Sequence, residues 1–387
     1  MSGGVRVSEG PATSEGAHAG EKARAGEGPA AIAGAPAGAG GLRPRAVTRC
    51  DVCPRRCALA PGQLGFCRAR RNTGGVVAPE SYGRVTSLAL DPVEKKPLAR
   101  WHPGSLVLSA GSYGCNLRCP FCQNWRISQA GPASGEKTRP ADDRQAERDV
   151  ATRAADSPDG EGRTDQARRA DDEGGPGSVT PRRPGLGVAR AAGDPDGVPW
   201  QLVSPEELVA LTCRQRELDP RVIGIAHTYN EPLVSWEYVR DCALLARRRG
   251  LATVLVSNGC ASEAAVRALV PLLDAANIDL KSWRPEVYRR YGGDLDAVRR
   301  TIEMLASEPG CHLEITTLVV PGENDDPAEM DAAARWLASL DPDLTLHVTR
   351  FFPCWRMADR APTPVSVVRD LADVARRHLC HVLVGNC

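Results

Sequence analysis

The sequence predicts an α/β protein, a full or partial (β/α) barrel of the TIM type that follows an N-terminal Cys-rich segment. Short apolar runs alternate with amphipathic helical stretches over most of the second half of the chain. Polar residues recur where these apolar runs end, and Cys residues gather in the first third. Strands that alternate with helices form βα units on a parallel sheet, and barrels of such units carry their active sites at the carboxyl ends of the strands.

The individual elements follow in order. The first strand, 106–110, is a buried apolar run that leads into a Cys-containing loop. The first long helix begins after Ser204, with Pro205 at the first helical position and Glu207 in the capping-box position. Further strands are predicted at 222–229, 252–257, 276–280, 312–320, 344–351 and 381–384, with helices at 233–250, 262–273, 295–307, 328–340 and 365–378.

Two stretches of biased composition divide the chain into segments. Residues 1–45 consist mostly of Gly, Ala, Pro, Ser and Glu, which predicts a disordered tail. Residues 46–100 form the Cys-rich N-terminal segment, and 101–387 form the barrel. Within the barrel, 131–199 is a low-complexity insertion without an apolar face, which we interpret as a mobile surface loop in preference to a lid.

Composition restricts the possible partners and compartment. The net charge of +1 gives no electrostatic case for nucleic acid or an anionic membrane surface. No apolar run approaches the roughly 20 residues that span a bilayer, and no signal peptide is recognisable. The 14 Cys therefore indicate metal and redox chemistry in the reducing cytoplasm, and we expect neither nucleic acid nor membrane as a partner.

Cys115, Cys119 and Cys122 form a C-x3-C-x2-C triplet directly after the first strand. Closely spaced Cys are typical ligands of a [4Fe–4S] cluster, and the absence of a fourth Cys at matching spacing leaves one iron open. S-adenosylmethionine (SAM) can chelate that iron and be cleaved by an electron from the cluster. With Phe121 before the third Cys, the triplet resembles the radical SAM signature. The alternatives are a zinc knuckle or unconnected thiols.

A second group of Cys lies upstream, at Cys50, Cys53, Cys57 and Cys67. Four thiolates in one short segment can hold Zn²⁺ or a second cluster, and the spacing does not choose between them. Pro and Gly residues in the segment favour tight turns that let the ligands converge. The alternative is a set of free thiols in a flexible arm.

Polar side chains at the ends of the later strands complete a candidate cofactor cleft. Each has a structural alternative: a carboxylate before Pro can cap a helix, Asn-Gly can form an ordinary turn, and Asp with Lys can be a surface pair. Together they favour a site at one rim of the barrel. The predicted rim residues are Glu231, Asn258, Asp279, Lys281 and His347.

The chain from Cys50 to Asn386, without the insertion, resembles the radical SAM enzymes of the AmmeMemoRadiSam system, which are relatives of the activating enzymes of pyruvate formate-lyase. The resemblance rests on an ordered series of motifs. They are Asp91-Pro-Val-Glu-Lys-Lys-Pro-Leu98, Gly114-Cys-Asn-Leu-Arg-Cys-Pro-Phe-Cys-Gln-Asn-Trp125, His227-Thr-Tyr-Asn-Glu-Pro232, Val256-Ser-Asn-Gly259, Asp279-Leu-Lys281, Glu314-Ile-Thr-Thr-Leu-Val-Val-Pro-Gly322 and Leu346-His-Val-Thr-Arg-Phe351.

This resemblance implies a radical SAM barrel and roles for the rim residues. Glu231 would meet the SAM amino group, although Thr228-Tyr-Asn-Glu231 departs from the Gly-Gly-Glu of the activating enzymes. Asp279 and Lys281 would lie by the methionyl end, Asn258 near the ribose, and His347 near the ribose or adenine. The expected cofactors are a [4Fe–4S] cluster and SAM, with a flavodoxin or ferredoxin as electron donor.

Two functions from different classes remain to be compared. The first is an enzyme that forms a 5′-deoxyadenosyl radical and abstracts hydrogen from a substrate, for which the resemblance suggests a protein glycyl residue. The second is a non-catalytic iron–sulfur or zinc protein that acts as an electron carrier or scaffold. The second explains the Cys groups but not the polar rim.

Overall fold

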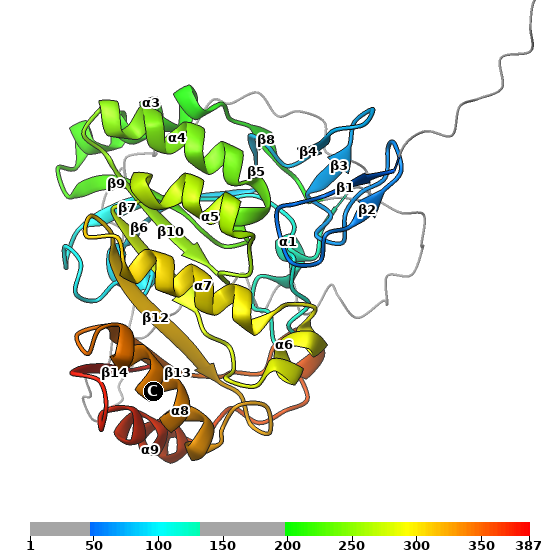
Figure 1. The fold of residues 1–387 in the computed structure, drawn as a ribbon. Helices are drawn as coiled ribbons and strands as arrows, with labels where there is room; N and C mark the ends of the chain where they lie inside the picture. Colours follow the sequence, from blue (N-terminus) through cyan, green and yellow to red (C-terminus); the bar gives the residue numbers. More distant parts are fainter. Residues whose placement is uncertain (1–46, 132–197) are drawn as a thin grey trace, which may run out of the picture. The chain divides into compact units, whose positions relative to one another are not determined.

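An open eight-stranded sheet forms the centre of the fold (Figure 1). The computed structural model describes residues 47–131 and 198–387. Seven strands run parallel, and β6 pairs antiparallel with β7 at one edge, in the order β14-β13-β12-β11-β10-β9-β7-β6. Because β6 and β14 do not pair, the barrel is partial. The strands are β6 (Ser87–Pro92), β7 (Leu106–Gly111), β9 (Val222–His227), β10 (Ala252–Ser257), β11 (Ala275–Asp279), β12 (His312–Val319), β13 (Thr345–Arg350) and β14 (His381–Gly385).

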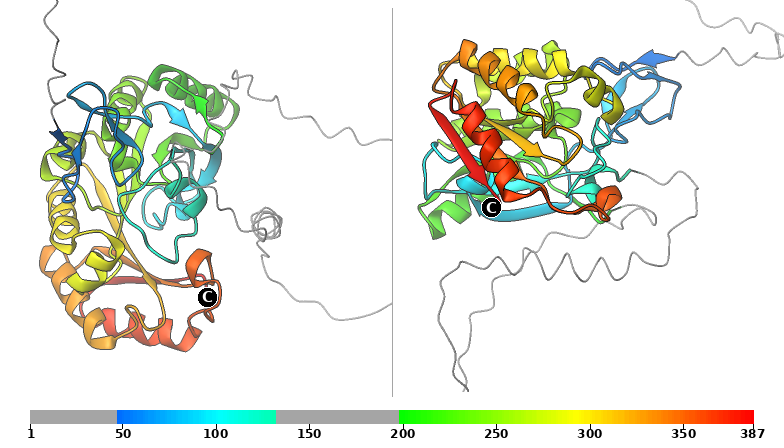
Figure 2. Two further views of the ribbon diagram at one scale, coloured as in Figure 1. Left: turned by 90° about the vertical axis from the view of Figure 1, so that its right-hand side faces the viewer. Right: turned by 90° about the horizontal axis from the view of Figure 1, so that it is seen from below.

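Helices cover one face of this sheet (Figures 1 and 2). Their apolar sides pack on alternate residues of the strands, such as Ile278, Ile315 and Val348, all of which are fully buried. The covering helices are α3 (Pro205–Leu218), α4 (Trp236–Arg248), α5 (Glu263–Leu269), α7 (Leu295–Ala306), α8 (Pro327–Leu340) and α9 (Val365–Ala375). Shorter elements are α1 (Trp125–Ser128), α6 (Pro285–Tyr291), η1 (Val93–Lys95), η2 (Pro232–Ser235), η3 (Val270–Leu272) and η4 (Trp355–Met357).

The predicted elements agree with the structure apart from their ends. The capping box at the start of α3 is confirmed, because Glu207 N donates to Ser204 Oγ and Ser204 N donates to the Glu207 carboxylate. The helix predicted from position 233 begins as the 3₁₀ turn η2, and α4 starts at Trp236. Strand β6 and helix α6 were not predicted, since both are short and lie outside the regular βα alternation.

The other face of the sheet is covered by the connection from β6 to β7. Pro97 O accepts a hydrogen bond from Asn277 Nδ2 at 2.8 Å, and the amides of Ala99 and Arg100 donate to Glu314 at 3.0 and 2.8 Å. His312 and His347 also direct their Nε2 atoms to the Glu314 carboxylate. A single buried carboxylate thus joins this connection to β12 and β13.

The Cys-rich segment is built from strand pairs of only two or three residues. It is attached to the barrel by a bidentate ion pair between Arg70 and Glu237, at 2.8 and 2.9 Å. Phe66 lies between the guanidinium groups of Arg55 and Arg118. The short strands are β1 (Thr48–Arg49), β2 (Ala58–Leu59), β3 (Arg70–Asn72), β4 (Val77–Pro79), and β5 (Arg84–Val85) with β8 (Gln201–Leu202).

The predicted tail at 1–45 and nearly all of the predicted insertion at 131–199 lie outside the described residues, so the domain boundaries stay predictions. Within 47–131 and 198–387, no helix has the length and apolar character needed to cross a membrane.

Candidate active site

The Cys triplet lies in the loop between β7 and α1, at the carboxyl end of the first parallel strand. Gly114, with φ of +88°, precedes the first Cys, and a Cβ at this position would lie 2.5 Å from Cys67 O. Only glycine fits such a close approach. Gly114 N donates to Ile127 O at 2.9 Å, and Cys115 N donates to Cys67 O at 3.2 Å. The loop is therefore fixed both to α1 and to the Cys-rich segment.

The sulfur atoms of the triplet accept hydrogen bonds from the protein. Cys115 Sγ accepts from Leu117 N at 3.3 Å and from Asn258 Nδ2 at 3.6 Å. The amide of Asn124 lies near Cys122 Sγ. Such donors stabilise a sulfur atom that carries negative charge as a metal ligand.

Lys281 is the cation that acts on the triplet most directly. Burial raises the pKa of Cys119 to about 12, and the positive charge of Lys281 opposes this shift. Lys281 Nζ is paired with Asp279 Oδ2 at 2.9 Å. Burial acts to lower the pKa of Lys281, but Asp279 and Cys119 outweigh burial and raise it, so the ammonium stays charged. A fixed positive charge here favours the thiolate form that iron requires.

Glu231 lies beside the triplet at the end of β9, with 2% of its surface exposed. Its carboxylate accepts hydrogen bonds from Leu233 N at 2.9 Å, Ser257 Oγ at 2.6 Å and Asn258 N at 2.8 Å. Burial raises its pKa to about 7. Glu231 thus caps η2 and at the same time holds the end of β10, and its contact with the SAM amino group stays a prediction.

Asn258 connects this carboxylate to the cluster loop. Its Oδ1 accepts from Cys260 N at 2.8 Å, and its Nδ2 donates to Asn116 Oδ1 at 3.0 Å as well as to Cys115 Sγ. The strand ends of β7, β9 and β10 therefore meet around Cys115, as predicted for residues at the carboxyl edge of a parallel sheet.

Two further predicted residues are placed less directly. His347 pairs with Thr316, which in turn pairs with Asp279, so it lies level with the Asp279–Lys281 pair, but its Nε2 contacts Glu314. Phe121 is buried and packs edge-on against Tyr291, with ring centroids 5.5 Å apart. Phe121 therefore supports the triplet from the core side, and the cofactor contacts of both residues stay predictions.

The fold brings to this region several residues for which the sequence predicts no role. Tyr229 has a φ of +72° and donates from its hydroxyl to Asp91 Oδ2 at 2.6 Å, and Lys96 Nζ pairs with the same oxygen at 2.7 Å. Asp91 and Lys96 belong to a motif that carried the resemblance, so a signal was present. A positive φ at a bulky residue is strained and is typical of functional sites.

The loop after β13 also reaches the triplet. Cys354 Sγ lies 3.6 Å from Cys122 O, and Trp355 stacks on Trp125 with centroids 6.1 Å apart. Arg356 N donates to Pro120 O at 3.0 Å. The sequence gives no signal for this contact, because more than two hundred residues separate its two sides.

The residues around the triplet suit an iron–sulfur cluster with bound SAM. Three free thiols share one loop, amides lie near two of them, and the partly buried ammonium of Lys281 acts electrostatically on the third. As positioned in 47–131 and 198–387, no group of three or more His, Cys, Asp or Glu side chains closes around a metal ion. The backbone and the donor set fit the cluster, whereas the thiols hold the conformations of free cysteines.

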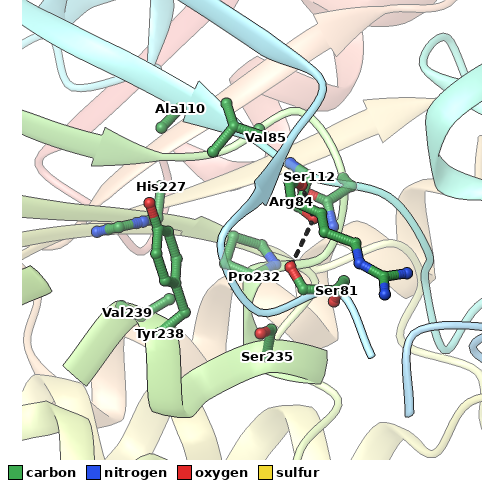
Figure 3. Close-up of a pocket in the computed structure, with 12 residues that line it drawn as sticks. Ser81, Arg84, Val85, Ala110, Ser112, His227, Pro232, Ser235, Tyr238 and Val239 are labelled. Atoms are coloured by element: carbon green, nitrogen blue, oxygen red, sulfur yellow. Dashed lines mark hydrogen bonds between the residues drawn. The ribbon is translucent and has the colours of Figure 1, made fainter. Parts of the chain in front are cut away.

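A small pocket lies apart from this site, between β5, β7, β9 and α4 (Figure 3). Its volume of about 20 Å³ has room for little more than one water molecule, so the pocket cannot hold SAM. Three polar atoms of its lining residues have no hydrogen-bond partner among the described residues: Ser81 Oγ, His227 Nε2 and Ser235 Oγ. Burial lowers the pKa of His227 to about 4, so this imidazole stays neutral.

Comparison with known proteins agrees with the class that the fold and site define. Residues 180–334 match the radical SAM superfamily, a range that includes the rim residues up to Lys281 but not the triplet. Over 341 residues the chain is 30% identical to the Uncharacterized protein MJ0808 of Methanocaldococcus jannaschii. The matched region covers 87% of this chain and 81% of that protein. The chain therefore contains a radical SAM domain, of the superfamily that cleaves SAM at a [4Fe–4S] cluster, and it is related to this archaeal protein over most of its length.

Two solved structures have a limited likeness to this chain. A domain of a pyruvate-formate lyase-activating enzyme from Bacteroides vulgatus is 18% identical and covers 42% of this chain and 99% of that chain, with a TM-score of 0.37. SuiB from Streptococcus suis bound to S-adenosylmethionine is 10% identical and covers 48% and 44%, with a TM-score of 0.40.

Proposed function

We propose that the protein is a radical SAM enzyme of the AmmeMemoRadiSam type that abstracts a hydrogen atom from a protein glycyl residue. The observation that carries the enzymatic part is the convergence of separate strand ends on the triplet. Glu231, Asn258 and Lys281 come from the ends of β9, β10 and β11, and all three act on the Cys loop. The motif series, including Asp91-Pro-Val-Glu-Lys-Lys-Pro-Leu98, supports the finer assignment.

The residues of this chain would divide the work as follows. Cys115, Cys119 and Cys122 would hold the cluster, which together with SAM supplies a 5′-deoxyadenosyl radical when bound. Lys281, fixed by Asp279, would balance the negative charge of the thiolates. Glu231 would hold Asn258 against Cys115 and keep the rim in place for SAM. The inner face of the sheet near Tyr229 would receive the substrate.

The first experiment separates an enzyme from an electron carrier or scaffold. The protein is reconstituted anaerobically with iron and sulfide, reduced with dithionite and given SAM. We expect 5′-deoxyadenosine by mass spectrometry and a change in the electron paramagnetic resonance spectrum of the reduced cluster on SAM addition. An unchanged spectrum and no product would support the carrier or scaffold.

The second experiment tests the glycyl substrate. Candidate proteins encoded beside the gene are produced with deuterated glycine and mixed with the reduced enzyme and SAM. Transfer of one deuterium to 5′-deoxyadenosine, together with a new organic radical signal, is expected. If deuterium is transferred from a different labelled amino acid and not from glycine, that amino acid is the substrate residue. The proposed SAM chemistry would then still hold, and only the glycyl assignment would be wrong.

A further inference from the structure

The four upstream thiols gather on two neighbouring turns. Cys50, Cys53 and Cys57 share a turn closed by Cys50 N donating to Cys57 O at 2.9 Å. Cys67 lies on a second turn, in which Gly65 N donates to Arg70 O at 2.8 Å. A Cβ built at Gly65 would lie 3.7 Å from Cys67 Sγ and 3.9 Å from Cys57 Sγ. Sulfur atoms of both turns therefore flank the same point.

The backbone around these thiols repeats the arrangement at the triplet. The amides two residues later, in Val52, Arg55 and Ala69, lie near the sulfur atoms of Cys50, Cys53 and Cys67. At the triplet, Cys115 Sγ accepts a hydrogen bond at 3.3 Å from Leu117 N, and the amide of Asn124 lies near Cys122 in the same way. Amide donors of this kind stabilise sulfur atoms that bind a metal. The local geometry is thus that of a metal-binding turn at five cysteines in two groups.

Little else in this segment explains why it folds. Its strands are two or three residues long, and its buried apolar side chains include only small or medium ones such as Val52, Leu59 and Ala69. Small units with so little apolar surface usually depend on a metal or on disulfides, and all described Cys are free thiols.

We propose that Cys50, Cys53, Cys57 and Cys67 form a second metal site with four thiolate ligands, distinct from the cluster site of the triplet. Zinc and iron–sulfur clusters both use this ligand set. The thiols do not close around an ion in their present conformations, so binding requires rotation of the Cys side chains about Cα–Cβ. The proposal goes beyond the proposed function and does not depend on it.

The second site would lie directly beside the first. Cys67 O accepts a hydrogen bond from the amide of Cys115 at 3.2 Å. Asn116, which lines one pocket together with Cys53, accepts a hydrogen bond from Asn258 Nδ2. Zinc in the four-thiolate site would fix the Cys loop in place. An iron–sulfur cluster there would relay electrons to the first cluster.

The test removes the first site and assays metal in what remains. The full-length Cys115→Ala, Cys119→Ala, Cys122→Ala variant is purified anaerobically and analysed by mass spectrometry for metals. We expect about one zinc or about four iron per chain. Adding Cys53→Ser and Cys57→Ser should abolish this metal, whereas adding Cys213→Ser and Cys380→Ser should retain it. A folded triple variant with neither metal overturns the proposal, as does metal that survives the Cys53 and Cys57 substitutions.

A second comparison covers the case in which the triple variant does not fold. The reconstituted wild-type chain is compared with the Cys53→Ser, Cys57→Ser variant, in which the triplet is intact. Loss of about one zinc with four sulfur neighbours by X-ray absorption, or a fall from about eight to about four iron, supports the site. Equal metal content in the two proteins overturns it.

Discussion

The two cysteine groups of this chain are neighbours, yet they are held in different ways. The triplet lies on a loop whose ends are fixed by β7 and α1 and whose surroundings come from three further strands. The quartet lies on turns between strands of two or three residues, with few large apolar side chains. The barrel therefore positions the ligands of the triplet, whereas in the quartet the ligands and their metal would position the chain. Substitutions in the triplet should therefore abolish SAM cleavage, and substitutions in the quartet should destabilise the Cys-rich segment.

The largest expected effect is on chemistry alone. Cys119→Ala removes one ligand of the triplet, so 5′-deoxyadenosine formation should fall to background. The barrel should remain folded, because Cys119 is one small side chain of a large hydrophobic core and the substitution removes only its sulfur. Product is measured by mass spectrometry and folding by circular dichroism. Cys380→Ala, at an exposed position, is the control and should keep activity. Full product from Cys119→Ala would contradict the cluster assignment.

The next effect is on structure. Arg70→Met leaves the partly buried Glu237 carboxylate without its partner, so the cost should lie between that of an exposed pair and the roughly 3–5 kcal/mol of breaking a fully buried one. Because this pair joins the Cys-rich segment to α4, hydrogen exchange should accelerate at 48–79 before it changes in the barrel. Arg267→Met breaks an exposed pair with Glu263 and should cost less than about 1 kcal/mol. Equal costs for the two variants would show that the segment does not depend on this attachment.

A third variant probes the inner face of the barrel. Burial acts to raise the pKa of Glu314, but hydrogen bonds from His312, His347 and two amides lower it to about 2. Since the folded-state pKa lies below the unfolded value near 4.5, the stabilisation is present above pH 4.5 and is lost as pH falls toward 2. Glu314→Gln should therefore cost on the order of 3 kcal/mol at pH 7.

The measurement is the free energy of urea unfolding of wild type and Glu314→Gln at several pH values. The gap between the two proteins should be constant from pH 7 to about 5 and shrink below that. Glu286→Gln, at an exposed position in α6, serves as the control with no such gap. A gap that does not change with pH would mean that the carboxylate charge is not what stabilises this face.

The fourth variant separates a positioning role from a helix cap. Glu231→Gln removes an acceptor from either Leu233 N or Asn258 N, and a bond of this charged type is worth roughly 1.5–3 kcal/mol. SAM affinity should fall by about ten- to a hundredfold, because Asn258 loses its support against Cys115. Ser257→Ala removes a donor to the same carboxylate but leaves the Asn258 amide bound, so it should weaken SAM less. An unchanged dissociation constant with a lowered Tm would assign Glu231 to capping alone.

The sequence predicted those parts of the fold and site that depend on local patterns. The alternation of apolar runs gives the parallel strands, and the Ser204–Glu207 spacing gives the start of α3. The edge strand β6 was missed because its antiparallel pairing with β7 has no counterpart in the βα pattern. The rim residues could be named because strand ends are local, and their contacts with a cofactor stay predictions. Contacts such as Cys354 with Cys122, and Tyr229 with Asp91, depend on tertiary packing and on a strained φ, which no local pattern encodes.

The smallest expected effect comes from a helix start that is remote from the triplet. Ser204→Ala removes the side-chain half of the α3 capping box, in which Glu207 N donates to Ser204 Oγ at 3.2 Å, and such a loss costs about 1 kcal/mol. SAM affinity and 5′-deoxyadenosine formation should not change. Ser262→Ala is the matched variant, since Ser262 caps α5 with a longer bond of 3.4 Å while its amide donates to Val52 O beside the quartet. The free energy of urea unfolding should fall less in Ser262→Ala than in Ser204→Ala. The cap bond that is lost at Ser262 is the longer one, and the main-chain bond from Ser262 N to the Cys-rich segment remains. A larger cost for Ser262→Ala, with faster hydrogen exchange at 50–67, would show that the quartet relies on α5 for its structure and would weaken the distinction between the two cysteine groups.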